Sequence, residues 1–544
     1  MGNTASQRNQ NAPPSRQVTT KYGSMIGKRL VSKGEKQVDA FLGVPFAKAP
    51  VGNLRFAKPE PPDPWTGVKK AEEFGPRGMQ KDTFFFTKWK YGETSEDNLY
   101  LNIFTPVWEP PPGGFPVMVF VHGGAFVSDS SVKYGDIGIC THMVPHGVVM
   151  VTIQYRLGYM GFFSTGSSAC VDNLALWDMT AALRWINENI AAFAGNAGNV
   201  TVFGQSAGGA SVDLLSLSPH SRDLFHKVIP MAGNAACEWA INGDVVETCR
   251  KFAARIGVDE LDDVEFINKL RQVEAAKFAS SMRVGAGDIS NNRTEIGPRI
   301  DGDFLSRSPS ELRVDAPKKP TLVGTCQYEG LMFLMVDKNN VSAARLEQLI
   351  AEKIPEERYL DFKALRAEAL RLYIDPDKDR HDKKQLQIAL TNFYSDVFLN
   401  NGTQRFVLEQ LEQNNENVYL YSFDYCNAES WGILGWIMPF KGATHCTELA
   451  YLFNVGIVMD FTFNDNDNKM LSIMTKLWTN FAKYGNPNGR DNDAEKFSFE
   501  WLPVDKDHPH RYLSIKLEPQ MKANFHDGRP AFWANLKNRA SKQQ

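Results

Sequence analysis

Residues 199–217, NVTVFGQSAGGASVDLLSL, join a strand-like run to a helix-like run across one tight turn. The first run, NVTVFG, is rich in β-branched and aromatic side chains, which predicts a strand. Small residues follow Ser206, as a sharp turn between a closely packed strand and helix requires. The pattern G-x-S-x-G is short, so Ser206 needs a base, an acid and an oxyanion hole before it can be interpreted as a nucleophile.

Further apolar runs surround this turn on both sides in the sequence. Together with 199–204, they cover residues 115–121, 147–155 and 226–233 in the first half, then 320–326 and 417–423 in the second. The stretch 174–193 has helical spacing and connects two of the strands. Strands that are apolar on both faces and alternate with helices predict an α/β fold, with a large, mostly parallel sheet covered by helices on both faces and with further inserted helices.

Composition excludes several classes of function. The chain has 544 residues, of which 43% are hydrophobic and 23% charged, with a formal net charge of -3. That balance lacks the excess of positive charge that is typical of proteins that bind nucleic acid. No apolar run reaches the roughly 18 residues that a membrane-spanning helix needs. We therefore expect a large globular protein with a small-molecule ligand, and we leave its oligomeric state open.

Cysteine usage favours a reducing compartment. The seven cysteines are scattered and include no C-x-x-C pair, so they predict neither a zinc site nor a disulfide framework. We expect buried thiols and no metal or other cofactor. The polar N-terminus lacks the apolar core of a secretory signal, which favours a cytoplasmic location.

The N-terminal residues MGNTAS match the N-myristoylation pattern M-G-x-x-x-[ST], with Gly2 as the acceptor. The alternative is a disordered polar tail. A single myristoyl chain anchors a protein only marginally, so the most that this motif predicts is weak, reversible membrane association.

An oxyanion hole is indicated by the stretch VHGGAF, residues 121–126, at the end of the strand-like run 115–121. Glycines at this place let backbone N–H groups face a reacting oxygen with no side chain in the way. We assign Gly123 and Gly124 to the hole. Ala207, the residue after the serine, supplies a third N–H group.

The base and the acid should follow the serine in the order serine, acid, histidine. His445 lies in a loop before an apolar helical run and is the predicted base. Glu329 comes just after the strand-like run 320–326 and is the predicted acid that orients the imidazole. Asp396 is the second candidate for the acid.

Taken in order, these motifs resemble the type-B carboxylesterases, the cholinesterase-like branch of the α/β-hydrolases, and within it an intracellular invertebrate-type esterase. The resemblance rests on FLGVPFAKAPVGNLRF, SEDNLYLNIFTP, VHGGAF, NVTVFGQSAGG, YEGLMF, GATHCTELAYLF and WTNFAKYGNPN. It runs over residues 18–535 as a single domain, between polar tails at 1–17 and 536–544. The resemblance implies the α/β-hydrolase fold and the same roles for Ser206, Glu329 and His445.

Departures from the family pattern restrict the class of ester that we expect as the substrate. Gln205 stands where relatives usually have glutamate, and Cys446 follows the histidine where glycine is common. Trp89 lies in the segment that holds a choline-stacking tryptophan in cholinesterases, but lysines flank it. A cationic ester such as acetylcholine is therefore a poor expected substrate. Secreted relatives also carry disulfide cysteines at positions that hold Gly78 and Asn98 here.

Three functions follow from these features. The leading prediction is a serine carboxylesterase that hydrolyses esters through an acyl-enzyme. The second is a catalytically silent binding or adhesion protein, because the family includes members that bind partners through the same fold. The third is acyl transfer, in which an alcohol or amine replaces water as the acceptor.

Overall fold

The computed structural model describes residues 12–31, 36–82, 87–260, 262–280, 294–377, 379–456, 460–490, 496–536 and 539. Gly2 and the rest of the N-terminal motif lie outside these ranges. Nearly all of the C-terminal tail that begins at residue 536 lies outside them too.

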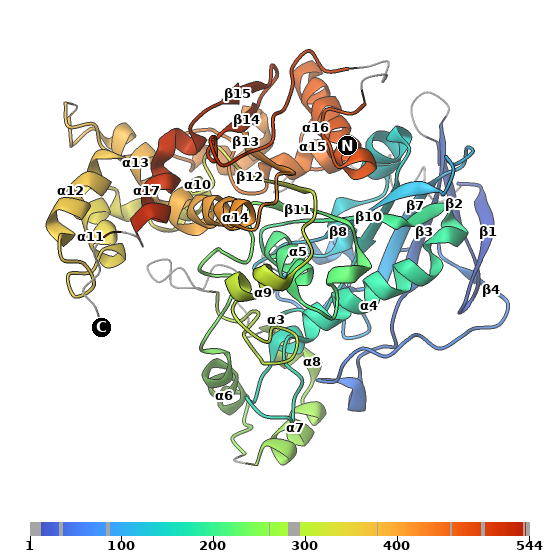
Figure 1. Cartoon of the computed structure of the whole chain (residues 1–544). Coiled ribbons are helices and arrows are strands. Elements are labelled where there is room, and N and C mark those ends of the chain that lie inside the picture. The colour runs from blue at the N-terminus through green and yellow to red at the C-terminus, as the bar shows by residue number, and fades with distance from the viewer. Residues whose placement is uncertain are drawn as a thin grey trace.

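A 13-stranded sheet crosses the molecule (Figure 1), in the spatial order β1-β2-β3-β7-β9-β8-β10-β11-β12-β13-β14-β15, with β4 beside β2. Strands β8 to β14 pair in parallel, whereas β1, β2, β3, β7 and β9 pair antiparallel at one end and β14 with β15 at the other; β4 pairs in parallel with β2. The strands are β1 Pro14–Thr20, β2 Gly23–Val31, β3 Gln37–Pro45, β4 Val68–Lys70, β7 Tyr100–Pro106, β8 Phe115–Val121, β9 Val149–Ile153, β10 Gly195–Gln205, β11 Lys227–Met231, β12 Thr321–Cys326, β13 Val418–Phe423, β14 Tyr512–Ile515 and β15 Gln520–Lys522. Two short strands, β5 Arg77–Gly78 and β6 Thr94–Ser95, form a separate pair.

Helices cover both faces of the sheet and extend beyond it. Figure 1 shows α4 and α5 on one side of the central strands, α15 and α16 on the other, and α11 to α13 with α17 as an outer group. Their bounds are α2 Thr87–Tyr91, α3 Gly158–Phe162, α4 Leu174–Asn189, α5 Ala207–Leu217, α6 Val245–Arg255, α7 Asp263–Gln272, α8 Ala275–Ser280, α9 Pro309–Asp315, α10 Leu331–Val336, α11 Ala343–Lys353, α12 Phe362–Arg371, α13 Lys383–Ser395, α14 Asn401–Glu412, α15 Ala450–Phe453, α16 Asp465–Tyr484 and α17 Arg529–Asn535.

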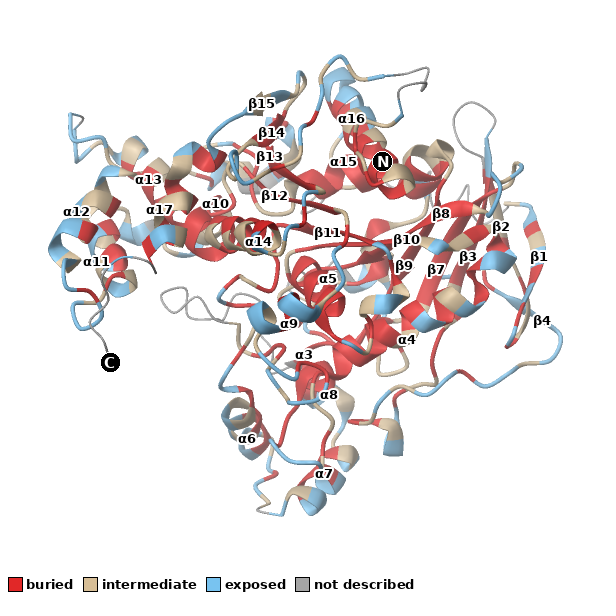
Figure 2. Cartoon of the chain, viewed as in Figure 1, coloured by how far each residue is buried: buried red, intermediate tan, exposed pale blue. Residues whose placement is uncertain are grey.

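The central strands contribute side chains to two different hydrophobic cores, one on each face of the sheet. In β8, Val117 and Val119 pack with the residues of α4 and α5, while Met118 and Phe120 pack with those of α15 and α16. This alternation follows from the two-residue period of a strand. It explains why the run 115–121 is apolar throughout, and Figure 2 shows the corresponding buried layer along the middle of the sheet.

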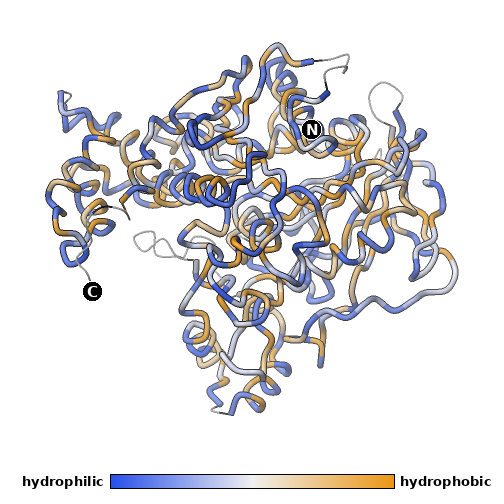
Figure 3. Tube along the Cα trace, in the orientation of Figure 1, coloured by the Kyte–Doolittle hydropathy of each residue, from blue (hydrophilic) through white to orange (hydrophobic). Residues whose placement is uncertain are grey.

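The predicted α/β fold with a mostly parallel central sheet is confirmed. The run 115–121 coincides with β8, and the stretch 174–193 forms α4, followed by a short 3-10 turn from Ile190 to Phe193. Along the outer helices α11 and α12, hydrophilic and hydrophobic segments alternate in Figure 3, as expected for helices with one solvent-facing side. Within the described residues, we find no helix long and apolar enough to cross a membrane.

Candidate active site

Ser206 sits in a strained turn between the end of β10 and the start of α5. Its backbone angles are φ 59° and ψ −124°, a conformation that non-glycine residues rarely adopt. Neighbouring glycines make the turn possible, because a Cβ atom on Gly204 would lie 2.6 Å from the carbonyl oxygen of Val121 and one on Gly208 would overlap that same oxygen. The G-x-S-x-G spacing is therefore a packing requirement between this turn and the end of β8.

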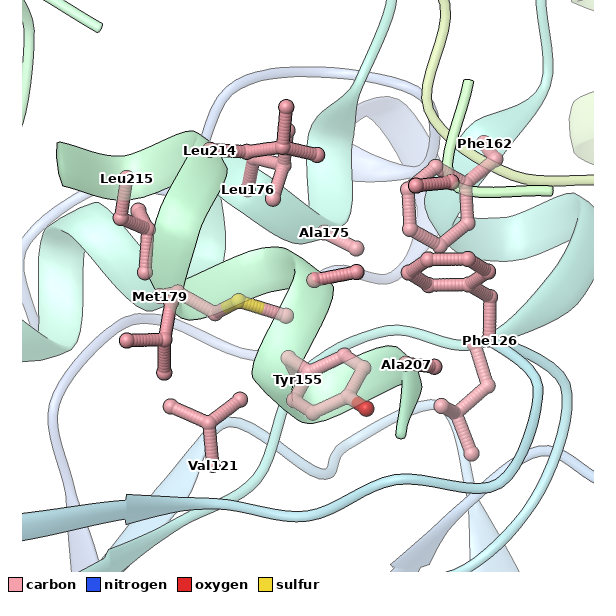
Figure 4. Packing of buried hydrophobic residues seen from close by; sticks show 14 of the residues in the cluster. Val121, Phe126, Tyr155, Phe162, Ala175, Leu176, Met179, Ala207, Leu214 and Leu215 are labelled. Atoms are coloured by element: carbon pink, nitrogen blue, oxygen red, sulfur yellow. The ribbon is translucent and has the colours of Figure 1, made fainter. Parts of the chain in front are cut away.

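Buried side chains pack against the turn that holds Ser206. Ala207 packs in the same core as Val121, Tyr155 and Phe126, as Figure 4 shows. The hydroxyl of Tyr155 donates a 2.7 Å hydrogen bond to the carbonyl oxygen of His122, and its ring stacks on the imidazole of His122. Tyr155 thus holds the VHGGAF segment by a hydrogen bond and by stacking, and the same core packs against Ala207.

The structure brings Ser206, His445 and Glu329 into one hydrogen-bonded row. The Ser206 Oγ lies 2.8 Å from His445 Nε2, and His445 Nδ1 lies 2.6 Å from Glu329 Oε2. The three residues come from three separate places: the turn after β10, the turn after β12 and the loop before α15. Both ring nitrogens of His445 are therefore engaged, one by the hydroxyl and one by the carboxylate.

Glu329 is held rigidly and fully buried. Its Oε1 accepts a 2.6 Å hydrogen bond from the backbone N–H of Cys326, and its side chain has no exposed surface. Burial lowers the pKa of His445, but the charge and hydrogen bond of Glu329 together with the charge of Glu448 outweigh it, so the net pKa is raised. The carboxylate thus favours the protonated imidazole.

Glu448 is a second buried carboxyl group beside this row, and it was not among the residues predicted from the sequence. Its Oε2 accepts a 2.8 Å hydrogen bond from the Cys326 thiol, while its Oε1 has no partner among the described residues. Burial and the charge of Glu329 raise the pKa of Glu448 to about 7. The only signal in the sequence is an acidic residue three positions after the predicted base.

Gly123, Gly124 and Ala207 carry backbone N–H groups on the segments next to Ser206. Gly123 approaches closely enough that a Cβ atom there would lie 3.2 Å from the Cβ of Ser206, and Gly124 has φ 95°. Neither these two N–H groups nor that of Ala207 is hydrogen-bonded to any described residue. Ala207 also begins α5, whose N-terminal dipole favours negative charge.

Gln205 and Cys446 form a polar contact next to the imidazole. The Cys446 thiol lies 3.2 Å from Gln205 Oε1, and Gln205 Nε2 lies 3.4 Å from both ring nitrogens of His445. Burial and the charge of Glu448 raise the pKa of Cys446 well above its usual range, so the thiol is protonated and donates. Cys446 also has φ 74°, a left-handed conformation that explains why glycine suits this position.

The remaining candidates lie elsewhere. The carboxylate of Asp396 accepts hydrogen bonds from Arg529 Nε at 2.9 Å and from the Tyr373 hydroxyl at 2.8 Å, so it is committed to another network. Trp89 is 85% exposed on the short helix α2.

All seven cysteines are free, but the expectation that all are buried is wrong for Cys426 and Cys446, which are half-buried. Within the described ranges, no cluster of three or more metal-binding side chains occurs.

Similarity to known proteins agrees with this geometry. Residues 14–533 match the carboxylesterase family, so the chain belongs to that family and is a carboxylic ester hydrolase with an α/β-hydrolase fold. It is 37% identical to esterase cest-33 of Caenorhabditis elegans over 93% of this chain and 92% of that protein. It is 31% identical to the medium-chain fatty acyl-CoA hydrolase precursor of Anas platyrhynchos, covering 96% of this chain and 92% of the relative. Human neuroligin-2 is also similar, at 30% identity over 95% of this chain and 67% of its own length.

Proposed function

We propose that the chain is a serine carboxylesterase in which Ser206 is the nucleophile, His445 the general base and Glu329 the orienting acid. The observation that carries the proposal is the position of His445, whose two ring nitrogens lie 2.8 Å from the Ser206 hydroxyl and 2.6 Å from the Glu329 carboxylate. A hydroxyl is a weak nucleophile until a base removes its proton, and this arrangement supplies that base in the correct tautomer.

Acylation begins when Ser206 Oγ attacks the ester carbonyl and His445 Nε2 takes the hydroxyl proton. The carbonyl oxygen becomes an oxyanion, which the N–H groups of Gly123, Gly124 and Ala207 stabilise. The imidazolium then gives its proton to the alcohol oxygen as the C–O bond breaks, leaving the acyl group on Ser206. Glu329 accepts the hydrogen bond from His445 Nδ1 and stabilises the imidazolium throughout.

Deacylation repeats these steps with water. His445 removes a proton from the water molecule, the resulting tetrahedral intermediate uses the same oxyanion hole, and Ser206 Oγ leaves with the proton returned by the imidazolium. No metal or redox group enters this sequence. The substrate class is a carboxylic ester with an uncharged alcohol, supported by the neutral side chain of Gln205 and the exposed position of Trp89.

Two alternatives use the same fold. A catalytically silent binding protein is the alternative that the similarity to neuroligin-2 leaves open. Against it stand the strained Ser206 turn and the unpaired N–H groups around it, since strain of about 1–3 kcal/mol at one residue is kept where function requires it. An acyltransferase would differ only in the acceptor that attacks the acyl-enzyme.

Covalent labelling tests the nucleophile. A fluorophosphonate probe should attach to one site, and peptide mapping should place it on Ser206. The matched control is Ser472→Ala, since Ser472 is exposed on α16, and it should label as the wild type does. Folded protein that does not label, or that labels equally well as Ser206→Ala, would refute the assignment.

A further inference from the structure

Cys326 lies at the end of a central strand, behind the ester site. It is the last residue of β12 and has no exposed surface. Because side chains alternate along a strand, Cys326 shares with Leu322 the face of the sheet that α15 and α16 cover. The same core contains Leu449, four residues after His445. The thiol therefore lies among the residues that follow the predicted base.

The backbone of Cys326 fixes one of the two buried carboxyl groups. Strand β11 pairs with β12 only as far as Met231, which lies opposite Gly324. Beyond this point, the N–H group of Cys326 donates a 2.6 Å hydrogen bond to Glu329 Oε1. The other carboxylate oxygen, Oε2, lies 2.6 Å from His445 Nδ1. The peptide group of Cys326 thus sets the position of the carboxylate that orients the imidazole.

The side chain of Cys326 holds the other buried carboxyl group. The thiol donates a 2.8 Å hydrogen bond to Glu448 Oε2. Among the described residues it is the only side-chain donor to Glu448, whose Oε1 has no partner there. Burial, followed by the charges of Glu448 and Glu329, raises the pKa of the thiol well above its usual range. The thiol therefore keeps its proton at neutral pH and acts as a donor.

This hydrogen bond opposes the two effects that favour a neutral Glu448. Burial and the charge of Glu329 raise the pKa of Glu448 to about 7, and the hydrogen bond from Cys326 is the largest effect in the opposite direction. A hydrogen bond donated to a carboxylate stabilises its ionised form. Ionised Glu448 in turn raises the pKa of His445. The thiol thus acts on the imidazole through Glu448.

Other titratable groups near the two carboxyl groups do not replace the thiol. The Tyr421 hydroxyl is buried, has no hydrogen-bond partner in the described part of the chain, and has its pKa raised well above the usual range, chiefly by burial. The Cys446 thiol lies 3.2 Å from Gln205 Oε1. Lys133, whose charge acts on Cys446, is paired with Asp129 at 3.5 Å. Each of these groups therefore leaves the contact with Glu448 to Cys326.

We propose that Cys326 is a positioning residue of the ester site, which orients the Glu329 carboxylate through its backbone and favours the ionised form of Glu448 through its thiol. This role rests on the proposed ester hydrolysis, because Cys326 reaches the reacting atoms only through these carboxyl groups and His445. One residue at the end of β12 thereby couples the turn after that strand to the segment before α15.

The pH dependence of kcat/KM for a neutral p-nitrophenyl ester tests the proposal with two variants that differ by one hydroxyl. Cys326→Ala removes the donor, so Glu448 should keep its proton to higher pH and favour the imidazolium less. The midpoint of the acid limb should then fall by about half a pH unit. Cys326→Ser keeps a donor and should keep the wild-type midpoint. Cys140→Ala is the control for a lost buried thiol, because Cys140 lies in the same core and hydrogen-bonds neither carboxyl group.

A double-mutant cycle separates this role from a merely structural one. In the Glu448→Gln background the thiol has no carboxylate to stabilise, so adding Cys326→Ala should leave the midpoint unchanged. A general loss of packing would instead lower the rate at every pH in both backgrounds. An unshifted midpoint in Cys326→Ala, or a shift that persists in the Glu448→Gln background, would overturn the proposal.

Two spectroscopic measurements need no turnover. The downfield proton NMR signal of His445 Nδ1–H should titrate with a midpoint that Cys326→Ala lowers by the same amount. In the wild-type protein, the infrared S–H stretching band of Cys326, assigned by its loss in Cys326→Ser, should move to lower frequency as Glu448 ionises. This band does not depend on the folding of Cys326→Ala, and a band insensitive to pH would overturn the proposal. If folded protein showed both titrations but no hydrolysis, the proposed ester hydrolysis would fail while the coupling of Cys326 to His445 would stand.

Discussion

At the scale of single residues, the chemistry depends on how His445 is balanced between burial and two carboxyl groups. Burial disfavours the imidazolium, whereas Glu329 at 2.6 Å and the nearby Glu448 favour it. The result is a base whose pKa is raised, close to a second acid whose own pKa of about 7 lies in the same range. His445 and Glu448 therefore titrate together, and a measured midpoint belongs to the pair of residues.

The pH dependence of kcat/KM should follow from the raised pKa of His445. Only the neutral imidazole can accept the Ser206 proton, so activity should be lost as the pH falls through a midpoint above the ordinary value of about 6.5. Glu448→Gln removes a charge that raises the pKa, so its midpoint should move to lower pH. A midpoint that stays fixed or moves upward in this variant would contradict the electrostatic account; a neutral p-nitrophenyl ester is the substrate for both profiles.

Substrate charge should be governed by Gln205, whose amide contacts the imidazole. Gln205→Glu places a carboxylate at this position and should raise the ratio of kcat/KM for a thiocholine ester over its neutral analogue about tenfold, a Coulomb effect of roughly 1–2 kcal/mol. Gln205→Asn is the neutral control and should leave the ratio unchanged. If the glutamate variant gives no increase, the charge of this residue does not select the substrate.

At the scale of elements, the close crossing of β8, β10 and α5 forms the site. Only Ser206 separates the end of β10 from the start of α5, and the carbonyl oxygen of Val121 fills the space that a side chain on Gly204 or Gly208 would need. The strain at Ser206 is therefore maintained by the packing of neighbouring elements rather than by the turn alone.

Gly208→Ala should disrupt this crossing. The added methyl group overlaps the Val121 oxygen, so we expect a loss of about 2–4 kcal/mol in the free energy of unfolding and a large loss of hydrolysis. Gly243→Ala is the matched control, because a Cβ atom there meets nothing within 4 Å. Thermal and urea denaturation measure both variants, and a stable, active Gly208→Ala protein would show that the crossing is more tolerant than the structure indicates.

Elements buried on both faces were predictable from the sequence, and elements at the sheet edges were not. The runs that became β8, β10 and β12 are rich in apolar side chains on both faces, because each strand contributes to two cores. By contrast, β1 and β3 carry register shifts between Pro14 and Gln17 and between Phe41 and Val44, which break the alternation that marks a strand. Glu448 could not be predicted as part of the site, because its role depends on folding that places it beside Glu329.

At the scale of the whole molecule, one sheet joins the two ends of the chain. Its strands run from β1, which begins at Pro14, to β15, which ends at Lys522, and the catalytic candidates come from turns in both halves. This continuity supports the proposal of a single domain, but the sheet already begins at Pro14, within the segment 1–17 that the sequence predicted as a tail. The contact between Ser206 and His445, 239 residues apart in the sequence, joins the two halves of the chain.

The seven free cysteines lead to a prediction about the entire chain. Protein purified without reductant and then denatured should react with about seven equivalents of a thiol reagent, because no two cysteines are bonded in the structure. A reducing compartment would maintain this state. A lower count that rises on reduction would reveal a disulfide and contradict the structure at this point.

We propose above all that Ser206, activated by His445, hydrolyses esters. The most direct measurement compares the hydrolysis of a short p-nitrophenyl ester by the wild-type protein and by Ser206→Ala, with circular dichroism showing that both are folded. We expect measurable wild-type turnover and a loss of about 10³-fold or more in kcat for the variant. Equal rates in the two proteins, or no hydrolysis by folded wild-type protein, would contradict it.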